Sequence, residues 1–392
     1  MGESVPRRRM VGTRADERLA FLTEWLDPQA GLVRRYQLFF YTPDQTVEMF
    51  DIKNRRIFLK RSKPAGNLTE RELFVGATIT LNGRQLNLVE YGDAYTASKM
   101  DGQRESTLAM IKPDAVAAGA TGKVIDAVLK AGLLISQLRM THMSPADAAR
   151  FYAEHEGKPF YSDLCAFMSS GRVVAMELVG PGAIAKWREI IGPTNTQKAR
   201  QEAPGSLRAQ FGTDGTQNAC HGSDSPSSAA REVSFFFGPD GRALVQTALM
   251  SEGVTLGIIK PKSFRKGFTG AILDAVLAAG YQITAMQVFN MDRPNALEFL
   301  EVYRGVVPEY NAMVEELTSG QLLAFEVSGY GDMTVAAFRE LCGPVDPEIA
   351  KTLRPNTIRA LYGADKVSNA IHCTDLNQDG VLESQYFFSV LQ

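Results

Sequence analysis

The chain contains 392 residues, 45% of them hydrophobic and 22% charged, and its formal net charge at pH 7 is −2. This length predicts two or three domains, each large enough to bury a core. A net charge near zero excludes broad electrostatic binding to nucleic acid or to anionic membranes, so we expect neither as a partner. The sequence also lacks an apolar run of the roughly 20 residues that a membrane-spanning helix needs.

The cysteines and the N-terminus favour a cytoplasmic location. The four cysteines form no CxxC pair and match no zinc-site spacing. We therefore expect free thiols in a reducing compartment, and no metal ion held by the protein itself. The first residues lack the apolar core of a secretory signal, which agrees with this location.

Residues 1–18 are polar and basic, and we expect them to form a flexible N-terminal tail. Residues 19–97 are predicted to form a small, mostly β domain, because short apolar and aromatic stretches alternate with turn residues. The expected strands are 35–41, 46–52, 56–59, 74–81 and 85–89. Asn82-Gly83 is typical of a two-residue hairpin turn. The domain contains no histidine or cysteine, which favours binding or docking over catalysis.

A polar link at 98–105 leads into a unit that occurs twice. Lys112 recurs 148 positions later as Lys260, and His221 recurs 151 positions later as His372. Because this spacing changes so little along the unit, we infer an internal duplication, and a period this long indicates tandem domains. The two predicted domains, copy A and copy B, are residues 104–240 and 253–392.

Both copies share one predicted order of elements: a strand, a helix, a strand, several helices, a strand, a helix, a histidine-bearing stretch and a final helix. The first strand stops before a proline, which cannot continue a ladder. This order is typical of a ferredoxin-like α/β sandwich, and we expect one sheet with helices on one side. The predicted fold class is α+β, with two tandem ferredoxin-like α/β sandwich domains preceded by the small mostly β domain.

Three apparent motifs do not fit the chemistry that they suggest. The stretch at 119–123 resembles a phosphate-binding loop but lacks the GxxxxGK[ST] spacing, and copy B has Ala271 in place of the lysine. The stretch at 375–380 resembles a calcium loop, but its twelfth position is Tyr386 and not a glutamate. No nucleophile elbow surrounds Ser223, which argues against a hydrolase triad.

Two of the four histidines occupy matching frames. His221 and His372 each lie three residues after an asparagine and three before an aspartate, and each precedes a glutamate by eleven residues. His142 and His155 have no counterparts, and we expect them to be packed or solvated. We therefore predict His221 and His372 as the reactive centres. The asparagines are Asn218 and Asn369, and the glutamates are Glu232 and Glu383.

Basic residues recur with these histidines. They are Lys112, Arg188 and Arg208 in copy A and Lys260, Arg339 and Arg359 in copy B. For one arginine a surface ion pair is the better explanation, but a set repeated around a repeated histidine favours a site. Fixed cations beside an imidazole suggest phosphate chemistry, because phosphoryl transfer requires neutralisation of spread oxyanion charge. A nucleophilic histidine also needs its second ring nitrogen held in a hydrogen bond, a role that we predict for the two glutamates.

Three stretches of copy A carry a resemblance to a known family: Ile-Lys-Pro-Asp at 111–114, Pro-Phe-Tyr at 159–161 and Asn-Ala-Cys-His-Gly-Ser-Asp-Ser at 218–225. Residues 104–238 and 253–391 resemble the nucleoside diphosphate kinases. The resemblance implies a ping-pong reaction in which His221 takes the γ-phosphate of a nucleoside triphosphate and passes it to a nucleoside diphosphate. It also implies that Mg²⁺ is carried by the nucleotide's phosphates and not by a protein cage.

The same resemblance implies a role for each site residue. Phosphates would be held by Lys112, Arg188, Thr194 and Arg208, the ribose by Asn218 with Lys112, and the base by stacking on Phe160, with Tyr152 supporting the site. Copy B keeps Lys260, Arg339, Arg359, Asn369, His372 and Glu383. It has Glu309, Val345, Leu300 and Cys373 in place of Phe160, Thr194, Tyr152 and Gly222. We therefore predict that turnover in copy B is impaired.

The N-terminal domain, from 32–41 through 47–54 to 58–61, resembles the DM-ten domain of axonemal proteins. That domain followed by two kinase copies is similar to the nucleoside diphosphate kinase 7 type. The resemblance implies a cytoskeletal protein of the ciliary axoneme, the centrosome or the basal body, bound to tubulin, to other axonemal microtubule proteins or to the γ-tubulin complex. The alternative function is a microtubule-associated structural protein of axonemal doublets with little or no turnover. The two copies are also predicted to pair within the chain as a pseudo-dimer, which favours a monomer.

Overall fold

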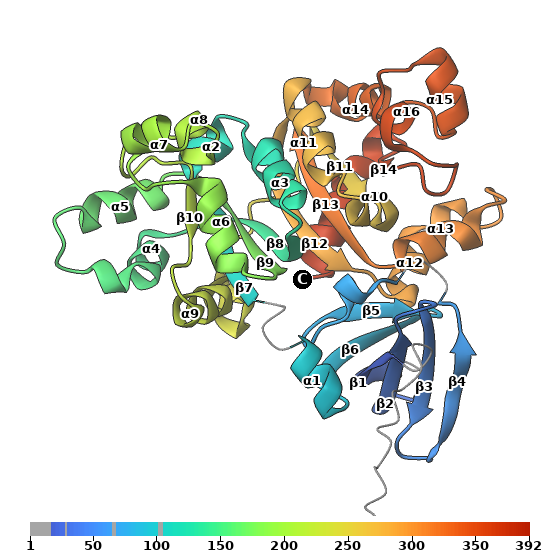
Figure 1. The fold of residues 1–392 in the computed structure, drawn as a ribbon. Helices are drawn as coiled ribbons and strands as arrows, with labels where there is room; N and C mark the ends of the chain where they lie inside the picture. The colour runs from blue at the N-terminus through green and yellow to red at the C-terminus, as the bar shows by residue number, and fades with distance from the viewer. Residues whose placement is uncertain (1–16, 28–29, 65–67, 101–104) are drawn as a thin grey trace, which may run out of the picture. The chain divides into compact units, whose positions relative to one another are not determined.

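The computed structural model describes residues 17–27, 30–64, 68–100 and 105–392. The chain divides into two compact units, residues 1–101 and 102–392. The first unit corresponds to the predicted β domain, and the second contains both kinase-like copies (Figure 1).

The first unit is built on a six-stranded antiparallel sheet in the order β4-β3-β2-β1-β6-β5. Its elements are β1 (Arg18–Asp27), β2 (Leu32–Tyr41), β3 (Thr46–Asp51), β4 (Arg56–Ser62), η2 (Glu70–Glu72), β5 (Thr78–Leu81), β6 (Arg84–Tyr91) and α1 (Ala94–Met100). Successive strand residues point to opposite faces, so alternate residues such as Leu19 and Phe21 of β1 form the core. The helix is fastened to the sheet by a hydrogen bond of 2.8 Å from the Ala20 N–H to Thr96 Oγ1.

Most of the predicted hairpin pattern is present in this unit. Asn82 has φ 48° and Gly83 has φ 74°, the positive values that a two-residue hairpin turn requires. The strand expected at 74–81 begins only at Thr78, because the Ala77 N–H donates to the Phe74 carbonyl (3.0 Å) and closes a turn first. Strand β1 is missing from the sequence prediction, and α1 occupies the start of the expected polar link.

The second unit repeats one order of elements twice. Copy A contains β7 (Glu105–Ile111), α2 (Pro113–Ala117), α3 (Thr121–Lys130), β8 (Leu134–His142), α4 (Pro145–Phe151), η3 (Ala153–His155), α5 (Tyr161–Met168), β9 (Arg172–Gly180), α6 (Ala183–Ile191), α7 (Thr196–Glu202), α8 (Leu207–Phe211), β10 (Cys220–Gly222), α9 (Pro226–Phe237) and η4 (Pro239–Ala243). Copy B contains β11 (Val254–Ile259), α10 (Pro261–Arg265), α11 (Thr269–Ala278), β12 (Gln282–Asn290), α12 (Arg293–Phe299), η5 (Glu301–Tyr303), α13 (Tyr310–Leu317), β13 (Gln321–Ser328), η6 (Gly331–Met333), α14 (Thr334–Cys342), α15 (Pro347–Leu353), α16 (Ile358–Tyr362), β14 (Ile371–Cys373), η7 (Asn377–Asp379), α17 (Gly380–Gln385) and the π-helical η8 (Tyr386–Val390). The predicted duplication and the α+β fold class are confirmed.

The two copies share one eight-stranded sheet in the order β10-β7-β9-β8-β12-β13-β11-β14. Strands β8 and β12 meet at the centre, where Arg139 pairs with Gln287 in antiparallel register. The copies therefore pair within the chain, as the sequence predicts for a pseudo-dimer. The two histidine-bearing strands, β10 and β14, lie at opposite ends of this sheet.

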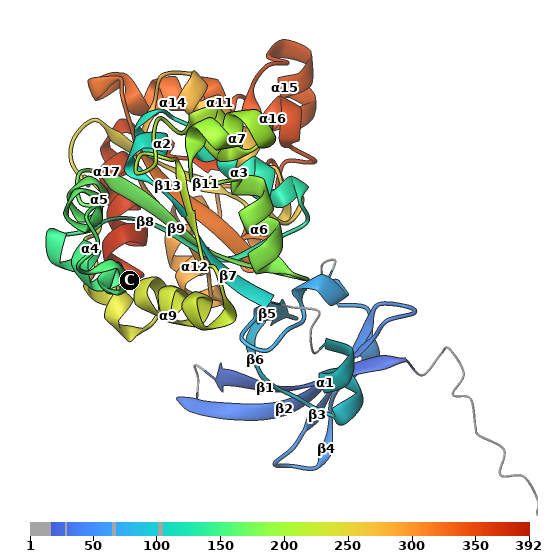
Figure 2. The same ribbon diagram turned by 60° about the vertical axis from the view of Figure 1, so that its left-hand side comes forward.

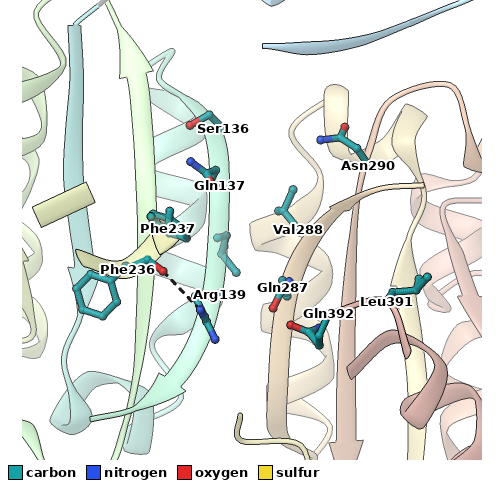
Figure 3. A pocket seen from close by; sticks show the side chains of 12 residues that line it. Ser136, Gln137, Arg139, Phe236, Phe237, Gln287, Val288, Asn290, Leu391 and Gln392 are labelled. Atoms are coloured by element: carbon teal, nitrogen blue, oxygen red, sulfur yellow. Dashed lines mark hydrogen bonds between the residues drawn. The ribbon is translucent and has the colours of Figure 1, made fainter. Parts of the chain in front are cut away.

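A groove of about 480 Å³ follows the join between β8 and β12 (Figure 3). Gln137 and Arg139 reach into it from β8, and Gln287 and Val288 from β12. Arg139 Nη1 donates to the Gly241 carbonyl at 2.6 Å, and burial lowers the pKa of this guanidinium. Polar side chains of the central strands line the groove together with apolar ones such as Phe237 and Leu391.

Helices α3 and α11 pack side by side across the same join (Figures 1 and 2). A Cβ atom added to Gly122 would lie 2.5 Å from the Asp274 amide nitrogen and 2.7 Å from the Gly270 carbonyl oxygen. A Cβ added to Gly270 would lie 2.5 Å from the Asp126 amide nitrogen. The helices therefore touch backbone to backbone, and the glycine of the apparent phosphate loop serves this contact.

Helices cover both faces of the sheet, so the expectation of helices on one side is wrong. On β7, Ile111 packs in one cluster with Val124 of α3, whereas the adjacent Met110 packs in another with Phe236 of α9. A strand that is apolar on both faces must be covered twice, and β7 has this composition. No helix in the described part of the chain is long and apolar enough to span a bilayer.

Gly122→Ala is expected to lower the free energy of unfolding by about 1–3 kcal/mol, because the added methyl group meets backbone atoms that cannot move aside. Urea denaturation of the full chain measures this loss. The matched control is Gly205→Ala, since a Cβ there has no atom within 4 Å. Equal stability of the two variants would show that the helices can separate without cost.

Candidate active site

His221 lies on β10 and is held by a glutamate from α9. Its Nε2 lies 2.8 Å from Glu232 Oε2, and Ser223 Oγ donates to the same carboxylate oxygen at 2.8 Å. Burial alone would raise the pKa of Glu232, but the hydrogen bonds from His221 and Ser223 lower it. An ionised carboxylate fixes the proton on Nε2 and leaves Nδ1 with its lone pair. Glu232 therefore contacts the ring directly, in the orienting position that the sequence predicts.

The walls of the site hold the rest of the histidine. The Phe151 ring centroid lies 5.4 Å from the imidazole and the Tyr152 centroid 5.9 Å from it, both edge-on. Trp187 Nε1 donates to the His221 carbonyl at 3.0 Å. Two residues earlier, Ala219 has φ 68°, a left-handed conformation that costs an alanine free energy. This strained residue directly precedes β10, the strand that carries His221.

Lys112 is buried beside the nucleophile's strand. Its Nζ donates to Asn218 Oδ1 at 2.7 Å and to the Thr216 carbonyl at 3.1 Å, and the residue is only 5% exposed. Burial, and then the charge of Arg208, lower the pKa of Lys112 to about 8. The Lys112–Asn218 pair predicted to hold a ribose is thus joined by a direct hydrogen bond.

Arg188, Thr194 and Arg208 line one pocket of about 370 Å³. Arg208 Nη1 donates to the Gly192 carbonyl at 2.7 Å, Nη2 donates to the Cys220 carbonyl at 3.0 Å, and burial lowers the pKa of the guanidinium. Arg188 is exposed and makes no ion pair with the residues that the structure describes. Arg208 is therefore fixed by two backbone carbonyls. Arg188 lies near Asp224, whose pKa is lowered by hydrogen bonds from Ser228 and Ser225 and also by the Arg188 charge.

Two aromatic residues flank the site: Tyr152 lies between α4 and η3, and Phe160 lies directly before α5. Phe160 is 46% exposed, and Lys158 Nζ lies 5.8 Å from the centroid of its ring. Tyr152 is buried, and its hydroxyl has no hydrogen-bond partner among the described residues. His155 contacts both rings, at centroid distances of 6.1 Å to Tyr152 and 5.7 Å to Phe160. His142 is packed, as expected, with Nε2 3.1 Å from the Ser169 carbonyl.

Copy B keeps the same frame around His372. Its Nε2 lies 2.9 Å from Glu383 Oε2, and Thr374 Oγ1 donates to that oxygen at 2.9 Å. Lys260 is buried, its Nζ donates to the Val367 carbonyl at 2.8 Å, and burial followed by the charge of Arg359 lowers its pKa to about 8. Asn369 Nδ2 donates to the Val345 carbonyl at 3.0 Å.

The two sites differ in a cluster that only copy B has. It consists of Tyr303, Arg339 and Asp375, and we call it the Asp375 cluster. The Tyr303 hydroxyl donates to Asp375 Oδ2 at 2.5 Å, and Arg339 Nη1 lies 3.3 Å from Asp375 Oδ1. The cation that corresponds to Arg188 is therefore already neutralised. The His372 side chain is 9% exposed, against 19% for His221, so copy B is also the more closed site.

No group of three or more His, Cys, Asp or Glu side chains within the described ranges is placed to hold a metal ion. The charged side chains gathered at His221 are mainly cations, which suit phosphate oxygens and repel a bare divalent ion. A metal ion bound to a phosphate ligand fits this set, because the ligand then supplies the anionic donors.

Comparison with known proteins agrees with this geometry. The nucleoside diphosphate kinase family model matches residues 105–241 and 253–392, and the nucleoside diphosphate kinase 7 N-terminal PH domain model matches residues 13–102. The nucleoside diphosphate kinase homolog 7 of Rattus norvegicus is 50% identical over 375 residues, covering 96% of this chain and 94% of that protein. That of Mus musculus is 48% identical over 382 residues, covering 97% and 95%. The nucleoside diphosphate kinase of Aquifex aeolicus (strain VF5) is 50% identical over 133 residues, covering 34% and 94%.

The chain belongs to the nucleoside diphosphate kinase 7 family. The resemblance seen in the sequence is thereby confirmed, and the two kinase domains imply nucleotide substrates. The N-terminal unit of this family member matches a PH domain model, while its DM-ten designation stays a prediction.

Sequence reasoning missed several residues that position the site in this family member. Asp114 Oδ2 accepts from the Ala219 N–H at 3.0 Å, Trp187 holds the His221 carbonyl, and Tyr303 builds the Asp375 cluster. Ser223 carries a signal that could have found it, since a hydroxyl residue follows the histidine by two positions in both copies. Trp187 and Tyr303 have no such signal, because their counterparts are Phe338 and His155.

Binding of ADP at pH 8 is expected to take up roughly half a proton in copy A. The pKa of Lys112 is about 8 in the free protein, and a nearby phosphate raises it, so the amine gains a proton on binding. Affinity should accordingly fall as the pH rises above 8. Calorimetry in buffers of different ionisation enthalpy measures the uptake. Lys112→Arg is the control, because an arginine is already charged; unchanged uptake in that variant would contradict this assignment.

Proposed function

We propose that the chain is an active nucleoside diphosphate kinase that works through a phosphohistidine at Nδ1 of His221. One observation carries the proposal: Glu232 holds Nε2 at 2.8 Å, and Nδ1 has no partner among the described residues. The ring thus has one nitrogen fixed as a donor and one available as a nucleophile.

In the first half-reaction, Nδ1 attacks the γ-phosphorus of a nucleoside triphosphate. The bond from that phosphorus to the β–γ bridging oxygen breaks, and the nucleoside diphosphate leaves with the bond's electrons. In the second, a terminal oxygen of another nucleoside diphosphate attacks the phosphohistidine, and the nitrogen–phosphorus bond breaks. Nε2 keeps its proton throughout, and the Glu232 carboxylate balances the positive charge of the ring.

The surrounding residues bind and neutralise the nucleotide. Arg188, Thr194, Arg208 and Lys112 hold the phosphates, Lys112 with Asn218 holds the ribose, and Phe160 stacks on the base. Stacking uses a π-face that every base presents, so it supports broad base tolerance. Mg²⁺ carried by the phosphates would supply further charge neutralisation.

We propose that copy B turns over poorly. The Asp375 cluster engages Arg339, and Val345 lacks the hydroxyl of Thr194. Glu309 replaces the stacking Phe160 and would repel the polyphosphate. His372 and Glu383 nevertheless keep their hydrogen bond, so copy B retains a nucleotide-type site.

Incubation with γ-labelled ATP is expected to give acid-labile label on His221 and little on His372. His221→Ala should lose the label, His372→Ala should keep it, and Glu232→Gln should slow labelling by roughly tenfold or more, because the tautomer is no longer fixed. Peptide mapping after brief incubation identifies the labelled residue. Label that persists in His221→Ala would refute the assignment. An unlabelled but folded protein would favour the structural alternative.

We further propose that the N-terminal unit docks the protein on microtubules of the ciliary axoneme, or on the γ-tubulin complex of centrosomes and basal bodies. The supporting observation is the hairpin of β3 and β4, whose tip exposes Lys53, Arg55 and Arg56 beside Ile57, which is 53% exposed. Exposed cations next to an apolar side chain suit an acidic protein surface such as tubulin.

Charge reversal of Lys53, Arg55 and Arg56 to glutamate in the full chain is expected to weaken co-sedimentation with microtubules by about tenfold or more, because several attractive contacts become repulsive. The control carries the same three reversals at Lys123, Lys198 and Lys351, exposed residues of the kinase copies. Equal binding of both variants would remove the hairpin from the docking surface.

A further inference from the structure

An arginine of α9 lies between two carboxylates at the edge of the His221 site. Arg231 Nη2 lies 2.8 Å from Glu154 Oε2 of η3 and 3.6 Å from Glu232 Oε1 of its own helix. Arg231 and Glu154 are exposed to solvent, whereas Glu232 is buried. We call these three residues the Arg231 bridge. It joins a surface carboxylate of one element to the buried carboxylate that holds the ring of the nucleophile.

The bridge reaches the oxygen of Glu232 that the histidine does not use. Glu232 Oε2 lies 2.8 Å from His221 Nε2 and accepts from Ser223 Oγ, while Arg231 is on the side of Oε1. Burial raises the pKa of Glu232, and the His221 and Ser223 hydrogen bonds, followed by the charge of Arg231, lower it. A carboxylate with a partner at each oxygen is restricted in rotation, so Arg231 favours one orientation of Glu232.

The other end of the bridge holds a wall of the site. Glu154 lies in η3, two residues after Tyr152, whose ring centroid is 5.9 Å from that of His221. The next residue, His155, contacts the Phe160 ring at a centroid distance of 5.7 Å. The ion pair therefore joins the segment that carries these aromatic residues to helix α9.

Copy B has lost both ends of the bridge. The residues that correspond to Glu154 and Arg231 are Val302 and Leu382, 148 and 151 positions later, and they are 73% and 61% exposed. The hydrogen bond between Glu383 and the histidine of copy B is kept, so the bridge supports this bond and is not a condition for it. The two charged residues are thus present together in one copy and absent together in the other.

We infer that Arg231 is a positioning residue of the phosphoryl-transfer site in copy A, where it holds the Glu232 carboxylate against His221 and joins the aromatic wall to α9 through Glu154. The inference rests on the proposed function, because it concerns the phosphorylation of His221. Its two contacts have separate consequences. Loss of the Glu232 contact slows transfer, since the imidazole is held less firmly. Loss of the Glu154 contact weakens nucleotide binding, since Phe160 lies beside the released segment.

The test is the initial rate of His221 phosphorylation by γ-labelled ATP in the full chain, over a range of ATP concentrations. Arg231→Leu, which introduces the residue of copy B, is expected to lower the maximal rate about three- to fivefold and to raise the half-saturating ATP concentration by a similar factor, as for loss of an exposed ion pair. Glu154→Val should raise the half-saturating concentration alone. Arg231→Lys keeps the charge and should lie closer to the wild type than Arg231→Leu.

The matched control is Lys130→Leu, which removes an exposed ion pair of 2.5 Å to Asp126 on α3 and should change neither quantity. A charge exchange then separates the two contacts. Glu154→Arg combined with Arg231→Glu restores an ion pair between η3 and α9 but places a carboxylate beside Glu232. The half-saturating ATP concentration should return towards the wild-type value, while the maximal rate should stay as low as in Arg231→Leu or fall further.

Two results would overturn the inference while leaving the proposed function intact. They are wild-type kinetics in Arg231→Leu, and full recovery of the maximal rate in the charge-exchanged variant, which would show that Arg231 acts through Glu154 alone. A wild-type protein that takes no label would refute the proposed function, and this inference with it.

Discussion

The close contact between helices α3 and α11 sets the arrangement of the whole kinase unit. Gly122 and Gly270 bring two helix backbones together, and that approach lets β8 and β12 join into one sheet. One apolar cluster then extends through both copies and includes Val124 of α3 and Ile272 of α11. Because burial of apolar surface is the main stabilising contribution to folding, each copy relies on the other for part of its core.

This rigid centre leaves the reactive groups on the short outer strands. β10 and β14 each contain three residues, and each follows an alanine with positive φ, Ala219 or Ala370. A glutamate from the last α-helix of each copy fixes the imidazole in both sites. The two sites differ at this arginine: Arg188 in copy A makes no ion pair with the described residues, while Arg339 in copy B is paired with Asp375, which also accepts from Tyr303. The same histidine–glutamate arrangement therefore occurs in a more exposed site in copy A and in a less exposed site in copy B.

Features that recur in both copies, or that depend on residues adjacent in the chain, could be predicted from the sequence. The repeated histidine, its glutamate and its cations were enough to predict the duplication and the main residues of each site. Asn82-Gly83 was enough to predict a hairpin, because turn geometry depends on neighbouring residues. Residues that act through tertiary contact had no comparable pattern. Trp187 reaches the His221 carbonyl from another element, Tyr303 reaches Asp375 across 72 positions, and helices on both faces of the sheet follow from packing. Strand β1 was missed because its pairing with β2 and β6, not its local pattern, defines it.

The joining of both copies in one polypeptide has a consequence for how they can change. Two separate identical subunits that meet about a two-fold axis must present the same residues to each other, so any substitution appears twice. Here the linker makes pairing intramolecular, and the pairing equilibrium no longer depends on protein concentration. Each half is then free to accumulate substitutions that the other never shares. The lost ion pair, the Asp375 cluster and the lost aromatic of copy B are the divergence that such release from symmetry permits.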